Sequence, residues 1–215
     1  MTASRAFAPL LIAALLGAAL QAHAATSANL LTNGDAESGT LSSWTAGGVS
    51  NPFVDNGRFN PGIGPQSGLY AFVGGTGSDG SLSQTVSLAG FSGNLLAHVS
   101  FGETGLDQGA NSDAGYVSLS FLGAGNAVLG SARSPEVDSH AGWATWSGDF
   151  ALPTGTTAIT YTMNFTRHAG SDLDAYFDNN VLSVTAAVPE PASAALLLSG
   201  LGLLGWQGRR RQRRA

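Results

Sequence analysis

The chain has 215 residues, of which 11% are charged, contains no cysteine and carries a formal net charge of −5 at pH 7. The lack of cysteine excludes disulfides, thiol nucleophiles and cysteine-ligated metals. Residues 25–187 alone hold three arginines against thirteen aspartates and glutamates, a net charge of −10, which excludes a nucleic-acid partner because phosphates need basic side chains to neutralise them.

The first 24 residues have the pattern of a secretory signal peptide. Arg5 supplies a positive charge, the segment 7–20 is apolar, and Ala22-His23-Ala24 fits a small-x-small cleavage site. Cleavage after Ala24 would leave Ala25 as the mature N-terminus. An uncleaved signal anchor is the alternative, which the cleavage site disfavours.

Residues 25–187 predict one all-β domain. Their number suits a single core, and apolar residues alternate with polar ones at period 2, as in half-buried strands. The alternating segments are 81–88, 95–101, 117–121, 146–152, 159–165 and 176–185. About eight such strands separated by turn residues predict an antiparallel β-sandwich, and we expect a jelly roll. The glycine-rich stretch 74–80 lacks the lysine of a P-loop and is expected to be a loop between strands.

The two ends of this domain carry loose motifs. Asn-Leu-Leu-Thr-Asn-Gly-Asp-Ala-Glu-Ser-Gly at 29–39 precedes Trp44, and Ala-Tyr-Phe-Asp-Asn-Asn-Val stands at 175–181. With the Ser-Leu-Ser-Gln-Thr-Val-Ser-Leu strand at 81–88, these resemble galactose-binding-like jelly rolls, a group that includes many carbohydrate-binding modules. Ala36 stands where that group has Phe. The closing motif has one residue too many, so either Asp178 or Asn179 takes the usual Asp position.

The resemblance implies a structural calcium ion that joins the first turn to the last strand. Asp35, Glu37 and Asp178 would supply its carboxylates, since Ca²⁺ takes six to eight oxygen ligands. Three clustered carboxylates would repel one another without a cation. The alternative is that they are separate solvated groups on the surface.

Three aromatic side chains are candidates for contact with a sugar ligand. Trp143 lies one residue off the register of Trp146, which is expected in the core, and Phe53 and Phe59 flank the turn-prone 55–58. Plain packing is the alternative for each of them. His98 lies on the polar face of its strand and is expected to be an ordinary surface histidine. No Gly-x-Ser-x-Gly motif is present, and we expect no enzymatic activity.

The tail, residues 188–215, has three parts. Val188, Pro189, Glu190 and Pro191 are extended, because proline fixes φ and disfavours helix at the preceding residue. Residues 192–206 are apolar and would span about 22 Å as a single helix, less than a hydrocarbon core of about 30 Å. The third part is a cytoplasmic stop-transfer flank of five arginines: Arg209, Arg210, Arg211, Arg213 and Arg214.

This order resembles the PEP-CTERM tail, which an exosortase, a membrane-embedded protease, cuts near the Pro-Glu-Pro. The resemblance implies transient retention in the inner membrane by the C-terminal helix, followed by release to the cell surface or the extracellular space. The alternatives are a permanent anchor and a buried core helix, and the arginines oppose the second.

Together these patterns predict an exported, non-enzymatic protein of the cell surface or extracellular polymer matrix that is processed by an exosortase-type protease. The alternative is a carbohydrate-binding module that recognises exopolysaccharide or cell-surface glycan. A hydrolase has the least support, because no catalytic motif is found.

Overall fold

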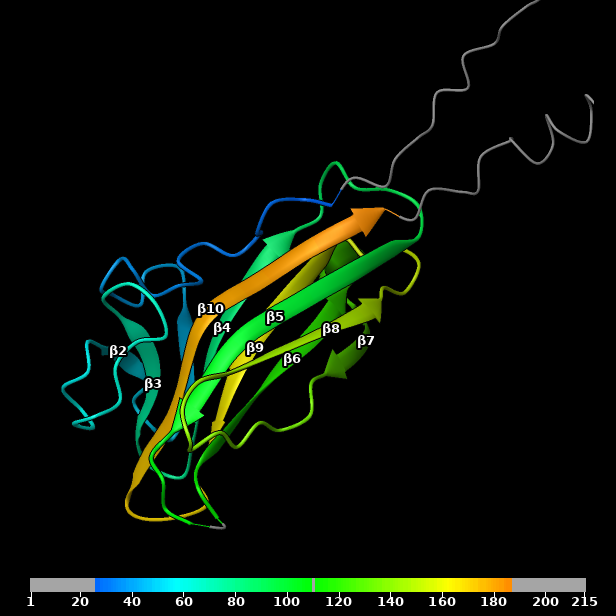
Figure 1. Cartoon of the computed structure of the whole chain (residues 1–215). Helices are drawn as coiled ribbons and strands as arrows, with labels where there is room; N and C mark the ends of the chain where they lie inside the picture. Colours follow the sequence, from blue (N-terminus) through cyan, green and yellow to red (C-terminus); the bar gives the residue numbers. More distant parts are fainter. Residues whose placement is uncertain (1–25, 110, 187–215) are drawn as a thin grey trace, which may run out of the picture. The chain divides into compact units, whose positions relative to one another are not determined.

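Ten strands and one short 3-10 helix, Ala124–Asn126, make up the part of the chain that the computed structural model describes, residues 26–109 and 111–186. The strands form two antiparallel sheets of five strands each (Figure 1). The first sheet has the order β1 (Thr45–Gly48), β4 (Asp79–Ser87), β9 (Ala158–Thr166), β6 (Ala114–Leu122) and β7 (Val128–Arg133). The second has the order β2 (Phe53–Asp55), β3 (Ala71–Thr76), β10 (Asp172–Ala186), β5 (Leu95–Gly105) and β8 (Ala144–Ala151). The predicted antiparallel sandwich is confirmed.

The core lies between the two sheets and is built by the predicted alternation. On β9 every second residue is at most 1% exposed, namely Ile159, Tyr161, Met163 and Phe165. The matching residues on β5 are Leu95, Ala97, Val99 and Phe101, which are also buried. Burying one large apolar side chain contributes about 1.5–3 kcal/mol, so this set accounts for much of the stability. The core placement of Trp146 is confirmed, since its half-buried ring lies 5.4 Å from that of Phe101.

The glycine-rich stretch 74–80 is mostly strand, so the expectation of a loop was wrong there. β3 extends to Thr76 and β4 begins at Asp79, which leaves only Gly77 and Ser78 between them. A Cβ atom at Gly74 would overlap the Leu173 side chain of β10. The glycines therefore allow neighbouring side chains to pack closely against these strands. In the sequence, glycines that serve this purpose cannot be told from glycines in a loop.

The closing strand contains a β-bulge. Asp178 pairs with Gly102 and Val181 with Ser100, so β10 advances three residues where β5 advances two. The surplus residue of the closing motif is absorbed there. Asn179 takes a left-handed conformation with φ of 52°, whereas Asp178 is fully buried.

The first turn meets the closing strand directly. The Asn180 backbone amide and its side-chain Nδ2 each donate to the carbonyl oxygen of Gly34 at 2.9 Å. Asn29 Nδ2 donates to the Asn180 carbonyl, also at 2.9 Å. Ala36 is buried in the main core despite its small size.

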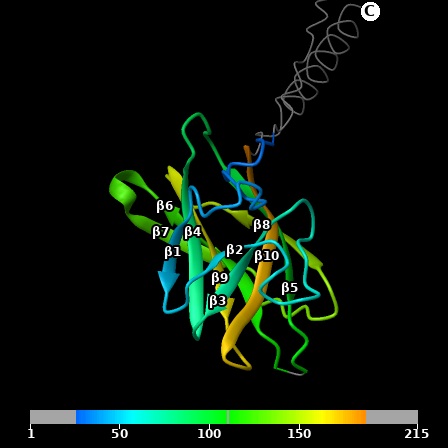
Figure 2. The same cartoon turned by 90° about the vertical axis from the view of Figure 1, so that its left-hand side faces the viewer.

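The two ends of the described chain lie side by side. Thr26 forms a β-bridge with Thr185, and Figure 2 shows the start of the described chain, in blue, beside the end of β10. Within residues 26–109 and 111–186 no helix is long and apolar enough to cross a membrane. The signal peptide expected at 1–24 and the tail expected at 188–215, with its sorting motif and arginines, lie outside the described residues.

Candidate functional site

The outer face of the second sheet presents the polar side chains of β5. These are His98, Ser100 and Thr104, which together with Gly102 alternate with inward-facing residues along this strand. From His98 to Thr104 the strand advances six residues, a length of about 20 Å. A hollow lies toward each end of this stretch, and together the two hollows and the strand between them form the candidate site.

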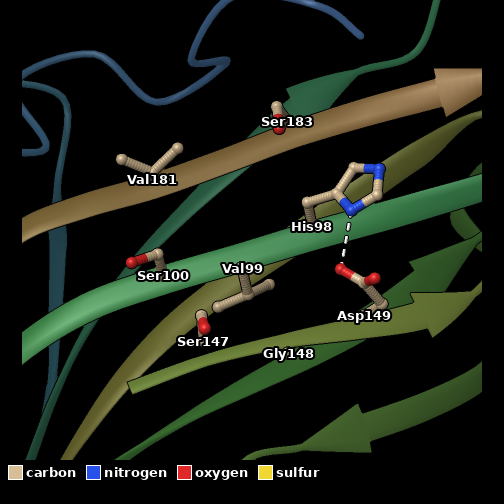
Figure 3. Close-up of a pocket in the computed structure, with 8 residues that line it drawn as sticks. All are labelled: His98, Val99, Ser100, Ser147, Gly148, Asp149, Val181 and Ser183. Atoms are coloured by element: carbon tan, nitrogen blue, oxygen red, sulfur yellow. Dashed lines mark hydrogen bonds and ion pairs between the residues drawn. The ribbon is translucent and has the colours of Figure 1, made fainter. Parts of the chain in front are cut away.

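The first hollow, here called the histidine hollow, has a volume of about 340 Å³. Figure 3 shows His98 on β5 directed toward Asp149 on β8, with β10 on the other side of β5. The hollow is lined by His98, Val99, Ser100, Ser147, Gly148, Asp149, Val181 and Ser183. Five of its eight lining residues carry polar side chains, and its walls come from three adjacent strands.

A chain of hydrogen bonds fixes the histidine. His98 Nδ1 lies 2.6 Å from Asp149 Oδ1, and His98 Nε2 lies 2.7 Å from Thr185 Oγ1. Thr185 Oγ1 is in turn 2.7 Å from Thr26 Oγ1. Because a carboxylate only accepts, the neutral imidazole carries its proton on Nδ1 and accepts from the Thr185 hydroxyl.

His98 lies on the polar outer face of its strand, as expected, but the partners of its ring were not predicted. Its side chain is 32% exposed and both ring nitrogens have partners. Asp149 and Thr185 were missed because they lie 51 and 87 residues away in the sequence. Their proximity follows from strand register, and the only signal in the sequence was their place on the polar face of predicted strands.

Three serine hydroxyls complete the histidine hollow. They belong to Ser100 on β5, Ser147 on β8 and Ser183 on β10. No hydrogen bond joins these hydroxyls to the other residues that the structure describes. Each can therefore donate to and accept from a polar ligand.

The second hollow, here called the tryptophan hollow, has a volume of about 440 Å³. It is lined by Gly62, Ile63, Gly64, Pro65, Thr104, Gly105, His140, Ala141, Gly142 and Trp143. Trp143 is half-buried, and its Nε1 donates to the Gly64 carbonyl at 2.9 Å. This bond holds the indole against the loop that forms the opposite wall.

The predicted aromatic residues gather on this outer face. Phe53, Phe59 and Trp143 all pack onto a small cluster of Ala71, Val73 and Tyr176, apart from the main core. The Phe53 and Phe59 rings meet edge to face, with centroids 5.2 Å apart. Of the three, Trp143 lines a hollow, and a ligand contact remains a prediction for each.

Side-chain bonds hold the loop 56–65 in place over the sheet. The Asp55 carboxylate accepts from the backbone amides of the next turn. Asn60 Nδ2 donates to Asp174 Oδ1 at 2.9 Å and to the Tyr176 hydroxyl at 3.1 Å. Burial raises the pKa of Asp174 and that of Tyr176, against the opposing effect of the Asn60 bonds. The wall of the tryptophan hollow is therefore preformed.

Gln66 lies between the two hollows. Its Nε2 donates to Thr145 Oγ1 at 3.1 Å, and its Oε1 accepts from Asn179 Nδ2 at 3.0 Å. A Cβ atom at Gly102 would overlap this side chain, so the glycine on β5 makes room for it.

The predicted calcium ligands are only partly gathered. Glu37 accepts the amides of Leu69 and Tyr70, and Asp178 accepts that of Ser67, so both carboxylates hold the same loop. Burial raises the pKa of Asp178 to about 6, and Glu37 adds to the rise. Asp35 is exposed and accepts from the Glu37 amide at 3.3 Å. Within the described ranges no group of three His, Cys, Asp or Glu side chains is placed to hold a metal, and calcium binding stays a prediction.

Comparisons with known proteins bear on the tail and on the fold of the chain. Residues 187–211 match the PEP-CTERM protein-sorting motif. No curated protein sequence matches the chain. Among solved structures, the chain is similar to TmCBM61 in complex with beta-1,4-galactotriose, at 23% identity and a TM-score of 0.52 over 73% of this chain and 98% of that one.

Enzymes share the fold as well. A cyclase from Fischerella sp. TAU has 14% identity and a TM-score of 0.56, over 77% of this chain and 100% of that one. The enzymatically active domain of Bacteriophage CBA120 tailspike protein 4 has 14% identity and a TM-score of 0.54, over 72% of this chain, which spans only 21% of the tailspike chain. Identities this low relate the folds alone. The chain thus carries a PEP-CTERM sorting motif behind a sandwich that resembles jelly-roll carbohydrate-binding modules.

Proposed function

We propose that this chain is an exported protein, processed at its PEP-CTERM motif by an exosortase-type protease, whose sandwich binds carbohydrate without catalysis. The observation that carries the binding role is the outer face of the second sheet. A half-buried indole stands at one end of it, and serine hydroxyls without protein partners among the described residues stand at the other.

This arrangement suits a sugar chain on chemical grounds. Trp143 offers an apolar ring beside polar groups, which matches the apolar face and hydroxyl rim of a hexose. The serines and His98–Asp149 offer both donors and acceptors. The neighbour solved with a bound galactotriose supports a sugar ligand for this fold.

A glycan array probed with the full-length chain in a mild detergent tests the proposal. Trp143→Ala should weaken binding at the tryptophan hollow, and Ser147→Trp should obstruct the histidine hollow from an exposed position on β8. Tyr116→Ala is the matched control, because Tyr116 lies on β6 of the other sheet. Unchanged binding in both site variants, at intact melting temperatures, would place the ligand elsewhere.

The rival role is a purely structural one in the extracellular matrix. It predicts that the wild-type chain binds no glycan on the array, while processing at the tail proceeds as before. That result would refute the binding role and leave the export proposal standing.

A further inference from the structure

The histidine hollow contains a carboxylate that is only partly satisfied. Asp149 is 59% exposed at its side chain, and its Oδ1 is engaged by His98 at 2.6 Å. Its Oδ2 makes no hydrogen bond to the residues that the structure describes. Of the serine hydroxyls of the hollow, that of Ser147 stands on the same strand, that of Ser100 on the adjacent β5 and that of Ser183 on β10 beyond it.

The described arginines do not neutralise this group. Arg133 lies over the Tyr116 ring at 5.2 Å, on the first sheet, and Arg167 donates to the Ser171 carbonyl. Arg58 belongs to the loop near the tryptophan hollow, and none of the three lines the histidine hollow. While the His98 imidazole beside it is neutral, Asp149 therefore presents negative charge to any ligand, within a body of net charge −10.

Resting on the proposed carbohydrate site, we propose that the histidine hollow selects an amine-bearing sugar, such as a hexosamine without its acetyl group, over acetylated and acidic sugars. An ammonium donates three hydrogen bonds, which Asp149 Oδ2 and the neighbouring serine oxygens accept. An N-acetyl group brings no charge to the carboxylate. A uronate brings a like charge, which the acidic body repels.

The size of the hollow fits this assignment. At about 340 Å³ it stands at the small end of ligand sites. It therefore accommodates one sugar residue with its amine, and the rest of the glycan extends along β5.

Isothermal titration of the full-length chain in a mild detergent at neutral pH tests the selection. The probes are the tetramers of β-1,4-linked glucosamine, of N-acetylglucosamine and of galacturonate. We expect the glucosamine tetramer to bind about fivefold more tightly than the acetylated one, the factor given by an exposed ion pair of about 1 kcal/mol. The galacturonate tetramer should bind most weakly.

Asp149→Asn should remove this preference, so that the glucosamine and N-acetylglucosamine tetramers bind the variant with equal affinity. Glu136→Gln is the matched control, because Glu136 also pairs with a histidine, His168 at 2.9 Å, but lies outside both hollows. An equal loss of preference in both variants would assign it to overall charge and overturn the inference. So would equal affinity of the wild type for the two tetramers, with the proposed glycan binding intact. Absence of binding to every tetramer and to the glycan array would instead refute the proposed function.

Discussion

The substitution Glu103→Gln should stabilise the sandwich at neutral pH, by an amount that grows with pH. Glu103 lies near the end of β5 and is fully buried. Its Oε2 accepts from the Ser139 amide at 3.0 Å, while Oε1 has no partner among the described residues. Burial, opposed by the Ser139 bond and reinforced by Asp138, raises its pKa from 4.5 to about 9. The folded protein therefore keeps this side chain protonated at pH 7.

The magnitude follows from the difference between the folded and unfolded pKa values. Above the unfolded value of 4.5 and below the folded value of about 9, the folded state holds one more proton than the unfolded state. Each pH unit in this window lowers the free energy of unfolding by about 1.4 kcal/mol. The contribution of Glu103 is thus fully present below the unfolded pKa. It has fallen by about 3 kcal/mol at pH 7, and it stops falling above the folded pKa.

Glutamine has nearly the same shape and cannot ionise, so it escapes this loss. The side-chain carbonyl of the introduced glutamine can still accept from the Ser139 amide. The advantage of the variant over the wild type should therefore increase by about 1.4 kcal/mol per pH unit.

Urea denaturation of residues 25–187 from about pH 5 to about pH 8.5 measures this difference, with equal m-values as the condition for comparison. Glu136→Gln, which removes an exposed carboxylate, should show no such increase. A difference between Glu103→Gln and the wild type that stays constant with pH would refute the reasoning.

Three further predictions concern processing, autonomy and calcium. Intact mass spectrometry of surface-extracted protein should find a species without residues 1–24 and cut near 188–191; a complete arginine-rich C-terminus in that fraction would contradict it. Residues 25–187 should fold alone, with a β-type circular dichroism spectrum and one melting transition, because their core is self-contained; failure to fold without the tail would count against this. We propose that millimolar Ca²⁺ raises the melting temperature, because a bound ion adds about 2.7 kcal/mol to the free energy of unfolding at a hundredfold excess over Kd. Glu37→Gln and Asp178→Asn should each flatten that response, and a wild type indifferent to calcium and chelator would refute the site.

The inward faces of the long strands could be predicted because one rule decides them. Burial of alternate apolar residues outweighs other local preferences, as on β9, where Ile159 to Phe165 alternate with threonines and an asparagine. Short strands carry too few residues for this rule. β2 has three residues and β1 has four, and neither was predicted.

The candidate site depends on contacts that alternation does not describe. Phe53 and Trp143 share a cluster because the loop 56–65 folds back over the sheet. His98 meets Asp149 and Ser183 because of the register in which β5 pairs with β8 and β10. A period of two separates the two faces of a strand, but it does not tell which strands are neighbours or which face a loop will cover.

The bulge in β10 connects the closing motif to the candidate site. Before it, Leu173, Ala175 and Phe177 face the core; after it, Leu182 and Val184 do so. The inward residues thus change from odd to even positions, which a regular strand cannot do because its side chains alternate strictly. One surplus residue resolves the conflict. Without it, the part of β10 that follows the bulge would direct Leu182 and Val184 to solvent and turn Val181 and Ser183 inward. The surplus residue of the closing motif is therefore the one that places Ser183 in the histidine hollow and keeps the core closed beneath it.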